Sequence, residues 1–115
     1  MAAQIRKTYR DINPEMLCDE VRDLVQKQGI VVGEARLQTY PLPSGLTQSR
    51  VTLIFKTAAK QKENQKECGY AHIIGSPAGE TKILFDLDEK LLPQETISNL
   101  QRDLDFTLGS YEVKW

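Results

Sequence analysis

The stretch Gly75–Lys82, GSPAGETK, combines glycines, hydroxyl groups and a lysine as phosphate-binding loops do. Such a loop requires the pattern G-x-x-x-x-G-K-[ST] between a strand and a helix. Here only three residues separate Gly75 from Gly79, and the lysine follows the threonine instead of preceding a hydroxyl residue. The flanking residues alternate as strands do, so no helix N-terminus would direct its amides at an anion. We therefore interpret this stretch as a hairpin turn, with Gly79 in a left-handed conformation.

His72 is the only histidine in the chain. Strand alternation in the segment CGYAHIIG would place it on one face with Cys68, Tyr70 and Ile74. Such a group could transfer protons or bind a metal. A zinc site, however, usually requires three or four ligands, and the only other cysteine, Cys18, lies far away in the sequence. We therefore favour a structural or ligand-contacting role for His72 and expect neither a metal nor a cofactor.

The other candidate nucleophiles and acidic residues give no stronger indication of a catalytic or metal site than His72 does. Cys18 falls on the apolar stripe of an expected helix, where burial raises the pKa of a thiol and makes it unreactive. Asp86 and Asp88 point the same way in a strand, but no calcium-loop spacing surrounds them. We interpret them as the solvated end of a strand and assign no catalytic residue, which favours a non-enzymatic protein.

The composition indicates an ordinary globular domain. The chain has 115 residues, 40% of them hydrophobic and 27% charged, with a formal net charge of −1. This length suits one domain, residues 1–115. The absence of a basic excess makes a nucleic-acid partner a weak hypothesis. No run of about 18 apolar residues could span a bilayer, and the N-terminus lacks the apolar core of a signal peptide, so we expect a cytoplasmic protein without a membrane partner.

Two segments carry the signals of amphipathic helices. The first begins after Asn13, a favourable N-cap, and ends before Gly29, with apolar residues repeating every three or four positions. The second extends from about Pro93 to Leu108 and is followed by Gly109.

Alternating or strongly β-forming segments predict five strands. They are 4–12, 29–40, 49–58, 67–75 and 81–88, with a polar hairpin tip at 59–66. The terminal residues 110–115 alternate as well and form either a short strand or a tail packed on the sheet. The sequence therefore predicts an α+β fold of order β-α-β-β-β-β-α, in which an antiparallel sheet of about five strands is covered on one face by two amphipathic helices.

The other face of such a sheet is the candidate binding surface. If Leu37, Leu53 and Phe55 point at the helices, then their neighbours in the strands point away. These neighbours include Arg36, Tyr40, Ile54 and Lys56. Aromatic residues and arginine are enriched at protein interfaces, whereas a mixed sheet face can also be simply the solvated side.

Two hypotheses of function follow. The first is a small non-catalytic module that binds a protein partner, or a second copy of itself, through the open face or the edges of its sheet. The alternative is a small-molecule-binding or enzymatic domain with a cavity between the sheet and the C-terminal helix, lined by Tyr70 and His72. A cavity of about 300 Å³ or more beneath that helix would favour the alternative.

Overall fold

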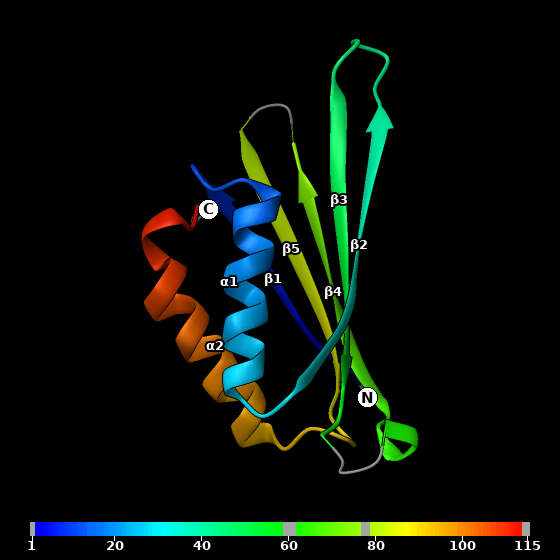
Figure 1. The fold of residues 1–115 in the computed structure, drawn as a ribbon. Coiled ribbons are helices and arrows are strands. Elements are labelled where there is room, and N and C mark those ends of the chain that lie inside the picture. Colours follow the sequence, from blue (N-terminus) through cyan, green and yellow to red (C-terminus); the bar gives the residue numbers. More distant parts are fainter. Residues whose placement is uncertain (1, 59–61, 77–78, 114–115) are drawn as a thin grey trace.

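The structure is a computed structural model, and it describes residues 2–58, 62–76 and 79–113. It shows a five-stranded antiparallel sheet with two helices packed on one face, which confirms the predicted fold class and element order (Figure 1). The strand order is β1-β5-β4-β3-β2. The strands are β1 (Ala2–Arg10), β2 (Val31–Pro41), β3 (Thr47–Lys56), β4 (Glu67–Gly75) and β5 (Glu80–Asp88), and the helices are α1 (Pro14–Lys27) and α2 (Gln94–Leu108).

Helix α1 begins and ends where the sequence predicted. The Oδ1 atom of Asn13 accepts a hydrogen bond of 2.8 Å from the backbone N–H of Met16, which satisfies one of the free amides of the first turn. At the other end Gly29 has φ +82°, and its N–H donates to the carbonyl of Gln26. Only glycine adopts this conformation without strain, so the helix stops there.

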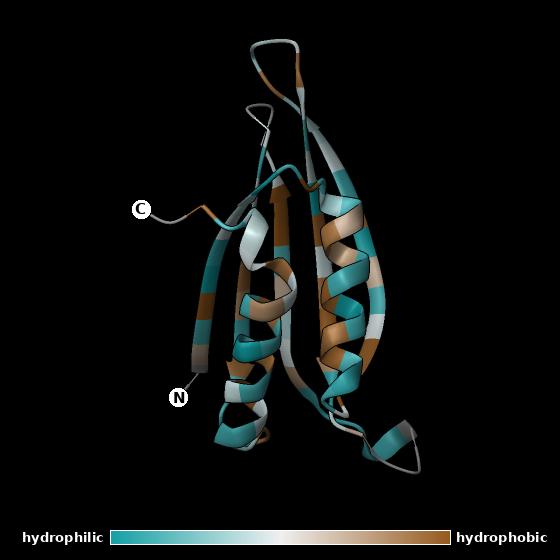
Figure 2. Cartoon of the chain, turned by 90° about the vertical axis from the view of Figure 1, so that its left-hand side faces the viewer, coloured by the Kyte–Doolittle hydropathy of each residue, from teal (hydrophilic) through white to brown (hydrophobic). Residues whose placement is uncertain are grey.

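Both helices bury their apolar stripes against the same face of the sheet. Figure 2 views the molecule from this side, with both helices lying in front of the strands. Helix α2 contributes four buried residues, Ile97, Leu100, Leu104 and Leu108. They join the buried face of the sheet, where Phe55 and Phe85 stack with ring centroids 6.2 Å apart. The space between the helices and the sheet is therefore filled by apolar side chains.

A bulge in β4 corrects one prediction about side-chain direction. Phe55 pairs with Gly69, but the next residue of β3, Lys56, pairs with Glu67, so Cys68 has no residue directly opposite. The extra residue turns Cys68 into the core, where it is fully buried, whereas Tyr70 and His72 remain on the other face. The expectation that Cys68 shares a face with Tyr70 and His72 is therefore wrong.

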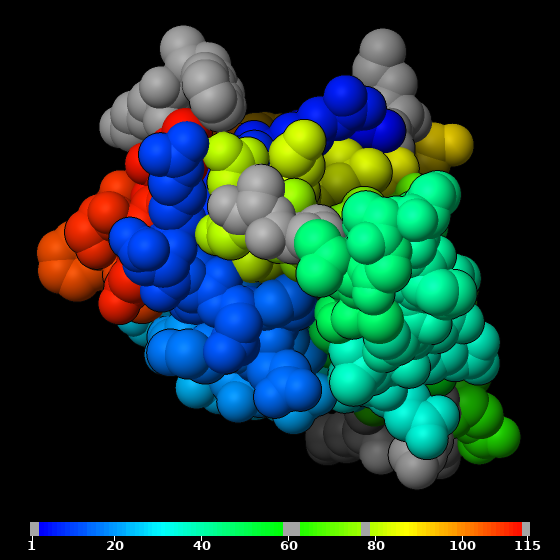
Figure 3. Space-filling model, turned by 90° about the horizontal axis from the view of Figure 1, so that it is seen from above, coloured from blue at the N-terminus to red at the C-terminus, as the bar shows by residue number. Residues whose placement is uncertain are grey.

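The hairpin of β2 and β3 extends beyond the rest of the sheet (Figure 1). Pairing between β2 and β3 continues to Pro41 and Thr47, whereas β4 pairs with β3 only from Ser49 onward. Seen from above, the hairpin stands at one corner of the molecule (Figure 3). Leu37 faces the helix side as expected but lies beyond the part of the sheet that α1 covers, and its side chain is 56% exposed.

Two connecting segments complete the fold. The predicted turn between β4 and β5 is confirmed: Ser76 and Glu80 close it through a backbone hydrogen bond of 2.8 Å, and Gly79 has φ +87°. Pro77 lies outside the described residues. After α2 the chain forms a short 3₁₀ helix, Gly109–Tyr111, and then packs along the outer edge of β1.

In the polar segment predicted as a hairpin tip, a 3₁₀ turn spans Lys62–Asn64, and residues 59–61 fall outside the described part of the chain. The terminal residues Lys114 and Trp115, which the alternation had included, also fall outside it. At the C-terminal end the described chain makes one bridge to β1, at Glu112, instead of a full strand.

Candidate functional site

The face opposite the helices carries two adjacent rows of side chains that we call the cationic rows. Strand register determines both rows, because directly paired residues of neighbouring strands point to the same face. The first row is Gln38, Arg50, Ile74, Lys82 and Thr8, and the second is Arg36, Thr52, His72, Leu84 and Arg6. The rows cross the whole sheet from β2 to β1 and contain no carboxylate.

The four cations of these rows are not neutralised by acids in the described part of the chain. The ion pairs found there involve Lys7, Arg10 and Lys27 instead. Arg6 donates to the amide oxygen of Gln4, and the guanidinium of Arg50 lies 5.1 Å from the centroid of the Tyr40 ring. Both contacts orient an arginine without removing its charge, so a chain with a net charge of −1 has a positive band across its open face.

The next row along the strands contains an acid and a tyrosine. It consists of Ile54, Tyr70, Asp86 and Gln4. The hydroxyl of Tyr70 donates to the Oδ2 atom of Asp86 at 3.3 Å, and the amide of Gln4 donates to the same oxygen at 3.5 Å. The negative charge of Asp86 raises the pKa of Tyr70, with smaller contributions from burial and the hydrogen bond. Asp86 is therefore engaged within its own row.

His72 occupies the centre of the open face. Its Nδ1 atom lies 3.1 Å from the hydroxyl oxygen of Thr52, directly across the strand pair. Its ring also contacts the ring of Tyr70, with centroids 4.7 Å apart and planes tilted by 54°. These contacts fix the position of the imidazole, which can offer its other nitrogen to a ligand.

An open depression of about 350 Å³ lies beside His72, over β1, β5 and β4. Its apolar side chains come from Ile74 and Leu84, and its cations on this face come from Arg6 and Lys82. Glu112 and Val113 form its outer wall. We call this hollow the β1–β5 depression.

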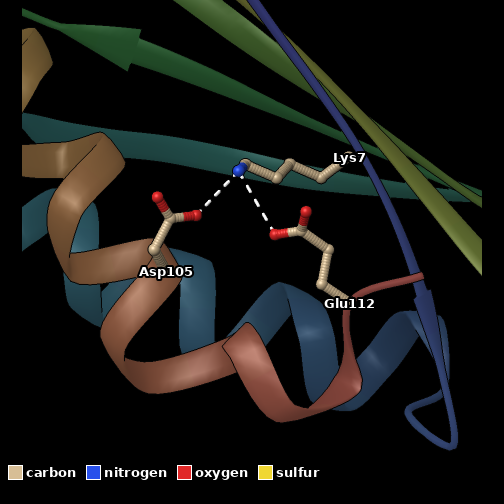
Figure 4. Close-up of polar contacts among 3 residues, drawn as sticks. All are labelled: Lys7, Asp105 and Glu112. Atoms are coloured by element: carbon tan, nitrogen blue, oxygen red, sulfur yellow. Dashed lines mark hydrogen bonds and ion pairs between the residues drawn. The ribbon is translucent and has the colours of Figure 1, made fainter. Parts of the chain in front are cut away.

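The half-buried Lys7 positions that outer wall (Figure 4). The Nζ atom of Lys7 lies 2.7 Å from a carboxylate oxygen of Asp105 in α2 and 3.2 Å from one of Glu112. Burial opposes the charge of Lys7, but the hydrogen bonds and charges of both acids outweigh it, so its pKa is raised above the ordinary value of 10.5. The N–H of Val113 also donates to the carbonyl of Thr8 at 2.8 Å. Together these contacts join the chain end to β1.

The fully buried Tyr9 lies close to this cluster. Among the described residues its hydroxyl has no hydrogen-bond partner. Burial raises the pKa of Tyr9, and the charges of Glu112 and Asp105 raise it further. The outer wall of the depression is thus held by the ion cluster of Lys7, Asp105 and Glu112, and the uncharged Tyr9 lies beside this cluster.

The residues predicted for binding divide into three groups in the structure. Arg36, Ile54 and Lys56 lie together and line a hollow of about 190 Å³. Tyr40 is separated from them, near the end of the projecting hairpin, where its hydroxyl donates to Gln38.

Tyr70 and His72 form the third group, at the centre of the open face. They do not lie beneath α2, because Ala71 and Ile73 occupy the helix-covered face of β4. The cavity expected between the sheet and the C-terminal helix would therefore not be lined by Tyr70 and His72.

The sequence interpretation did not single out Arg6, Arg50 and Lys82. The alternation that assigns Arg6 to the side opposite Ile5 and Tyr9 was already visible in the first strand. What was missing was the neighbour of that strand, because β1 ends at Arg10 and its partner β5 begins only at Glu80. Without this pairing, Arg6 could not be placed beside Lys82 and His72.

The described residues contain no group of three or more histidine, cysteine, aspartate or glutamate side chains that could bind a metal ion. Both cysteines are buried, and burial raises the pKa of each thiol. Neither α1 nor α2 is long and apolar enough to cross a membrane. Comparisons of the chain with protein-family models, with curated proteins and with solved structures found no match.

Proposed function

We propose that this protein is a binding module whose open sheet face holds an acidic, extended segment of a partner protein. The observation that carries the proposal is the pair of cationic rows, in which four cations lack a carboxylate partner among the described residues. Hydrogen bonds between such cations and a carboxylate are among the stronger ones that proteins make.

The spacing of the cationic rows suits a peptide better than a single ion. Neighbouring strands lie about 4.8 Å apart, so the cations of β1, β3 and β5 are spread over a distance that a short extended peptide covers. Ile74 and Leu84 lie between these cations and offer apolar contact to the alternate side chains of the peptide. An acidic and apolar alternation in the partner would complement this face.

The β1–β5 depression provides an anchoring point within this surface. A side chain that enters it would meet the apolar surface of Leu84, while a carboxylate at its rim would lie near Arg6 and Lys82. Interfaces derive most of their free energy from a few anchors that fill pockets, whereas the surrounding contacts mainly exclude water. We therefore expect Arg6 and Lys82, which line the depression, to contribute more than Arg36, which lies at the opposite edge of the sheet.

A second candidate function rests on the size of the same depression. Its volume of about 350 Å³ falls within the range of small-molecule sites. Its mixture of apolar side chains and two cations fits a small amphipathic carboxylate. Octanoate is a suitable probe, and the second candidate predicts NMR shifts confined to the residues that line the depression.

The main test uses a synthetic nine-residue peptide that alternates glutamate and leucine, labelled for fluorescence anisotropy. The double variant Arg6→Gln/Lys82→Gln should weaken its binding roughly tenfold or more, because two charge-assisted hydrogen bonds are lost. The control variant Lys90→Gln/Arg102→Gln removes the same charge from exposed positions away from this face and should leave binding unchanged.

Three results would contradict the proposal. The first is the absence of peptide binding, and the second is an equal loss in both double variants, which would indicate a non-specific response to net charge. The third is tighter binding of a single-stranded oligonucleotide than of the peptide, because that would assign the cations to phosphates.

A further inference from the structure

The two edges of the sheet differ in how they are covered. The outer edge of β1 is partly occupied by the chain itself, through the bridge from Tyr9 to Glu112 and the hydrogen bond from Val113 to Thr8. At the opposite edge β2 pairs only with β3 among the described strands. Its outer backbone groups are therefore available for pairing with another strand.

The segment Ala35–Pro41 of β2 lacks the features that usually protect an edge strand from pairing with another chain. Natural edges are commonly interrupted by bulges, prolines or several charges. In β2 the irregularity lies between Val32 and Ala35, and the only proline is the last residue, Pro41. The segment Ala35–Pro41 pairs regularly with β3 and carries a single charge, Arg36. It is thus a regular, exposed strand of seven residues with one free edge.

The side chains of this segment are exposed on both faces of the sheet. On the helix side Leu37 is 56% exposed, and on the open side Tyr40 is 39% exposed. Covering part of the apolar surface of both side chains would favour association. A strand added at this edge would lie beside both of them.

We propose that this edge pairs antiparallel with the same edge of a second copy of this chain, with the twofold axis at Gln38. Residue pairs across such an axis have numbers that sum to 76, so each Arg36 lies opposite Tyr40 of the other copy. An arginine beside an aromatic ring is a favourable cation–π pair, and Arg36 of the other copy would add to the contact that Arg50 already makes with the Tyr40 ring. A twofold axis at Arg36 would place two like charges directly opposite each other, which destabilises a strand pair.

The position at Gln38 also uses the whole regular segment. Gln38 is its midpoint, so all seven residues of Ala35–Pro41 pair, and the irregular part of β2 stays outside. Leu37 then lies opposite Thr39 of the other copy and covers its methyl group. The two sheets join into one continuous sheet of ten strands. The contact is small for a stable dimer, so association should depend on concentration.

The first experiment is sedimentation equilibrium of the unmodified chain from about 10 µM to about 1 mM, without any peptide ligand. We expect a reversible monomer–dimer equilibrium. Gln38→Lys places two cations opposite each other at the axis and should weaken the dimer roughly tenfold or more. The control Gln26→Lys adds the same charge to the exposed face of α1 and should not change it.

Disulfide cross-linking tests the register. Directly opposite Cβ atoms in an antiparallel pair lie about 5 Å apart, close to disulfide distance, whereas diagonal ones lie about 7–8 Å apart. With oxidised glutathione, Gln38→Cys should therefore give a covalent dimer, and Leu37→Cys and Gln26→Cys should not. The native Cys18 and Cys68 are buried, so they should not contribute.

A monomer throughout the concentration range would overturn the proposal, as would cross-linking through Leu37→Cys in preference to Gln38→Cys. Circular dichroism of each variant excludes unfolding as the cause of a lost dimer. Arg36 and Gln38 lie in both proposed surfaces, but the two outcomes can be distinguished, because dimerisation is measured without peptide and the peptide test changes Arg6 and Lys82 on the other half of the sheet. Either proposal can therefore fail alone.

Discussion

The two faces of the sheet are made from alternate residues of the same strands, yet they have different roles. On β5, Phe85 is fully buried beneath the helices, whereas the adjacent Leu84 lies partly exposed on the open face between Arg6 and His72. The covered face is filled with apolar side chains, and the open face carries cations that form no ion pair within the described ranges, around a shallow depression. Stability thus resides on one face, and the chemistry available to a partner resides on the other.

The difference between the faces arises because both helices cover the same face of the sheet. Both helices present their apolar stripes, and both pack on the same side. A charge on that side would be buried at a high cost unless paired, and Lys7 illustrates this with its two acids. On the open side cations stay hydrated, so they need no carboxylate partner, and none is found for them among the described residues.

The largest expected change in stability comes from comparing Phe85 and Leu84, two neighbouring residues that face opposite sides of the sheet. Phe85→Ala should lower the free energy of unfolding by about 3–5 kcal/mol, because it removes a buried ring that stacks on Phe55. Leu84→Ala should lower it by less than about 1 kcal/mol but weaken binding of the acidic peptide. Urea denaturation measures the first quantity and anisotropy the second. Equal stability losses would mean that the open face is part of the core.

The next effect tests the bulge that separates Cys68 from Tyr70. A Cβ at Gly69 would overlap the carbonyl oxygen of Asp86 and lie 3.0 Å from a methyl group of Leu87. Gly69→Ala should therefore cost about 2–3 kcal/mol in urea denaturation. Gly45→Ala is the matched control, because φ is +85° there but no atom lies within 4 Å, and it should cost about 1 kcal/mol. An equal cost at both positions would contradict the close approach of β4 and β5.

A smaller effect concerns Lys7 and alkaline pH. Lys7→Met should lower the free energy of unfolding by about 1–2 kcal/mol at pH 8, because two carboxylates lose a shared donor. The folded-state pKa of Lys7 is raised above 10.5, so its contribution is complete below the unfolded-state pKa and is lost as pH rises through the folded value. The raised pKa of Tyr9 acts in the same direction.

Stability should therefore fall above about pH 10, and less steeply in Lys7→Met than in the parent. Thermal unfolding monitored between pH 8 and pH 11 measures both slopes. Lys90→Met, at an exposed position, is the control and should follow the parent. Identical slopes for Lys7→Met and the parent would show that the cluster does not hold the chain end in solution.

The smallest expected effect is a gain in stability. Tyr9→Phe removes a buried hydroxyl that has no partner among the described residues, so it should raise the free energy of unfolding by up to about 1 kcal/mol. Tyr111→Phe alters an exposed tyrosine and should change it little. A loss of stability in Tyr9→Phe would reveal a hydrogen-bond partner for the hydroxyl, such as a buried water molecule.

Much of the fold could be predicted from local patterns. The N-cap at Asn13 and the stop at Gly29 bounded α1, because capping depends on residues within one turn. The alternation of Ile83, Phe85 and Leu87 predicted a strand with one buried face, and the structure confirms it. The outward direction of Arg36 and Ile54 followed from the same period of two, which holds wherever a strand is regular.

Local sequence patterns predicted the candidate site only in part. The bulge at Cys68–Gly69 shifted the alternation by one residue, and the isolated Gly69 was a local signal of it that the sequence interpretation did not use. Leu37 pairs with the buried Val51 but lies on the edge strand β2, and it remains 56% exposed. Both features depend on where the neighbouring strands and helices end.

By itself, the sequence determined which residues form helices and strands and, within each regular strand, which side chains share a face. Only the tertiary structure decided that β1 lies beside β5, which brings Arg6 to Lys82 and His72, and that Lys7 holds Glu112 beside β1. The physical reason is the sequence distance over which each effect acts. Periodicity and capping act over a few residues, whereas strand order is selected by the packing of the whole core.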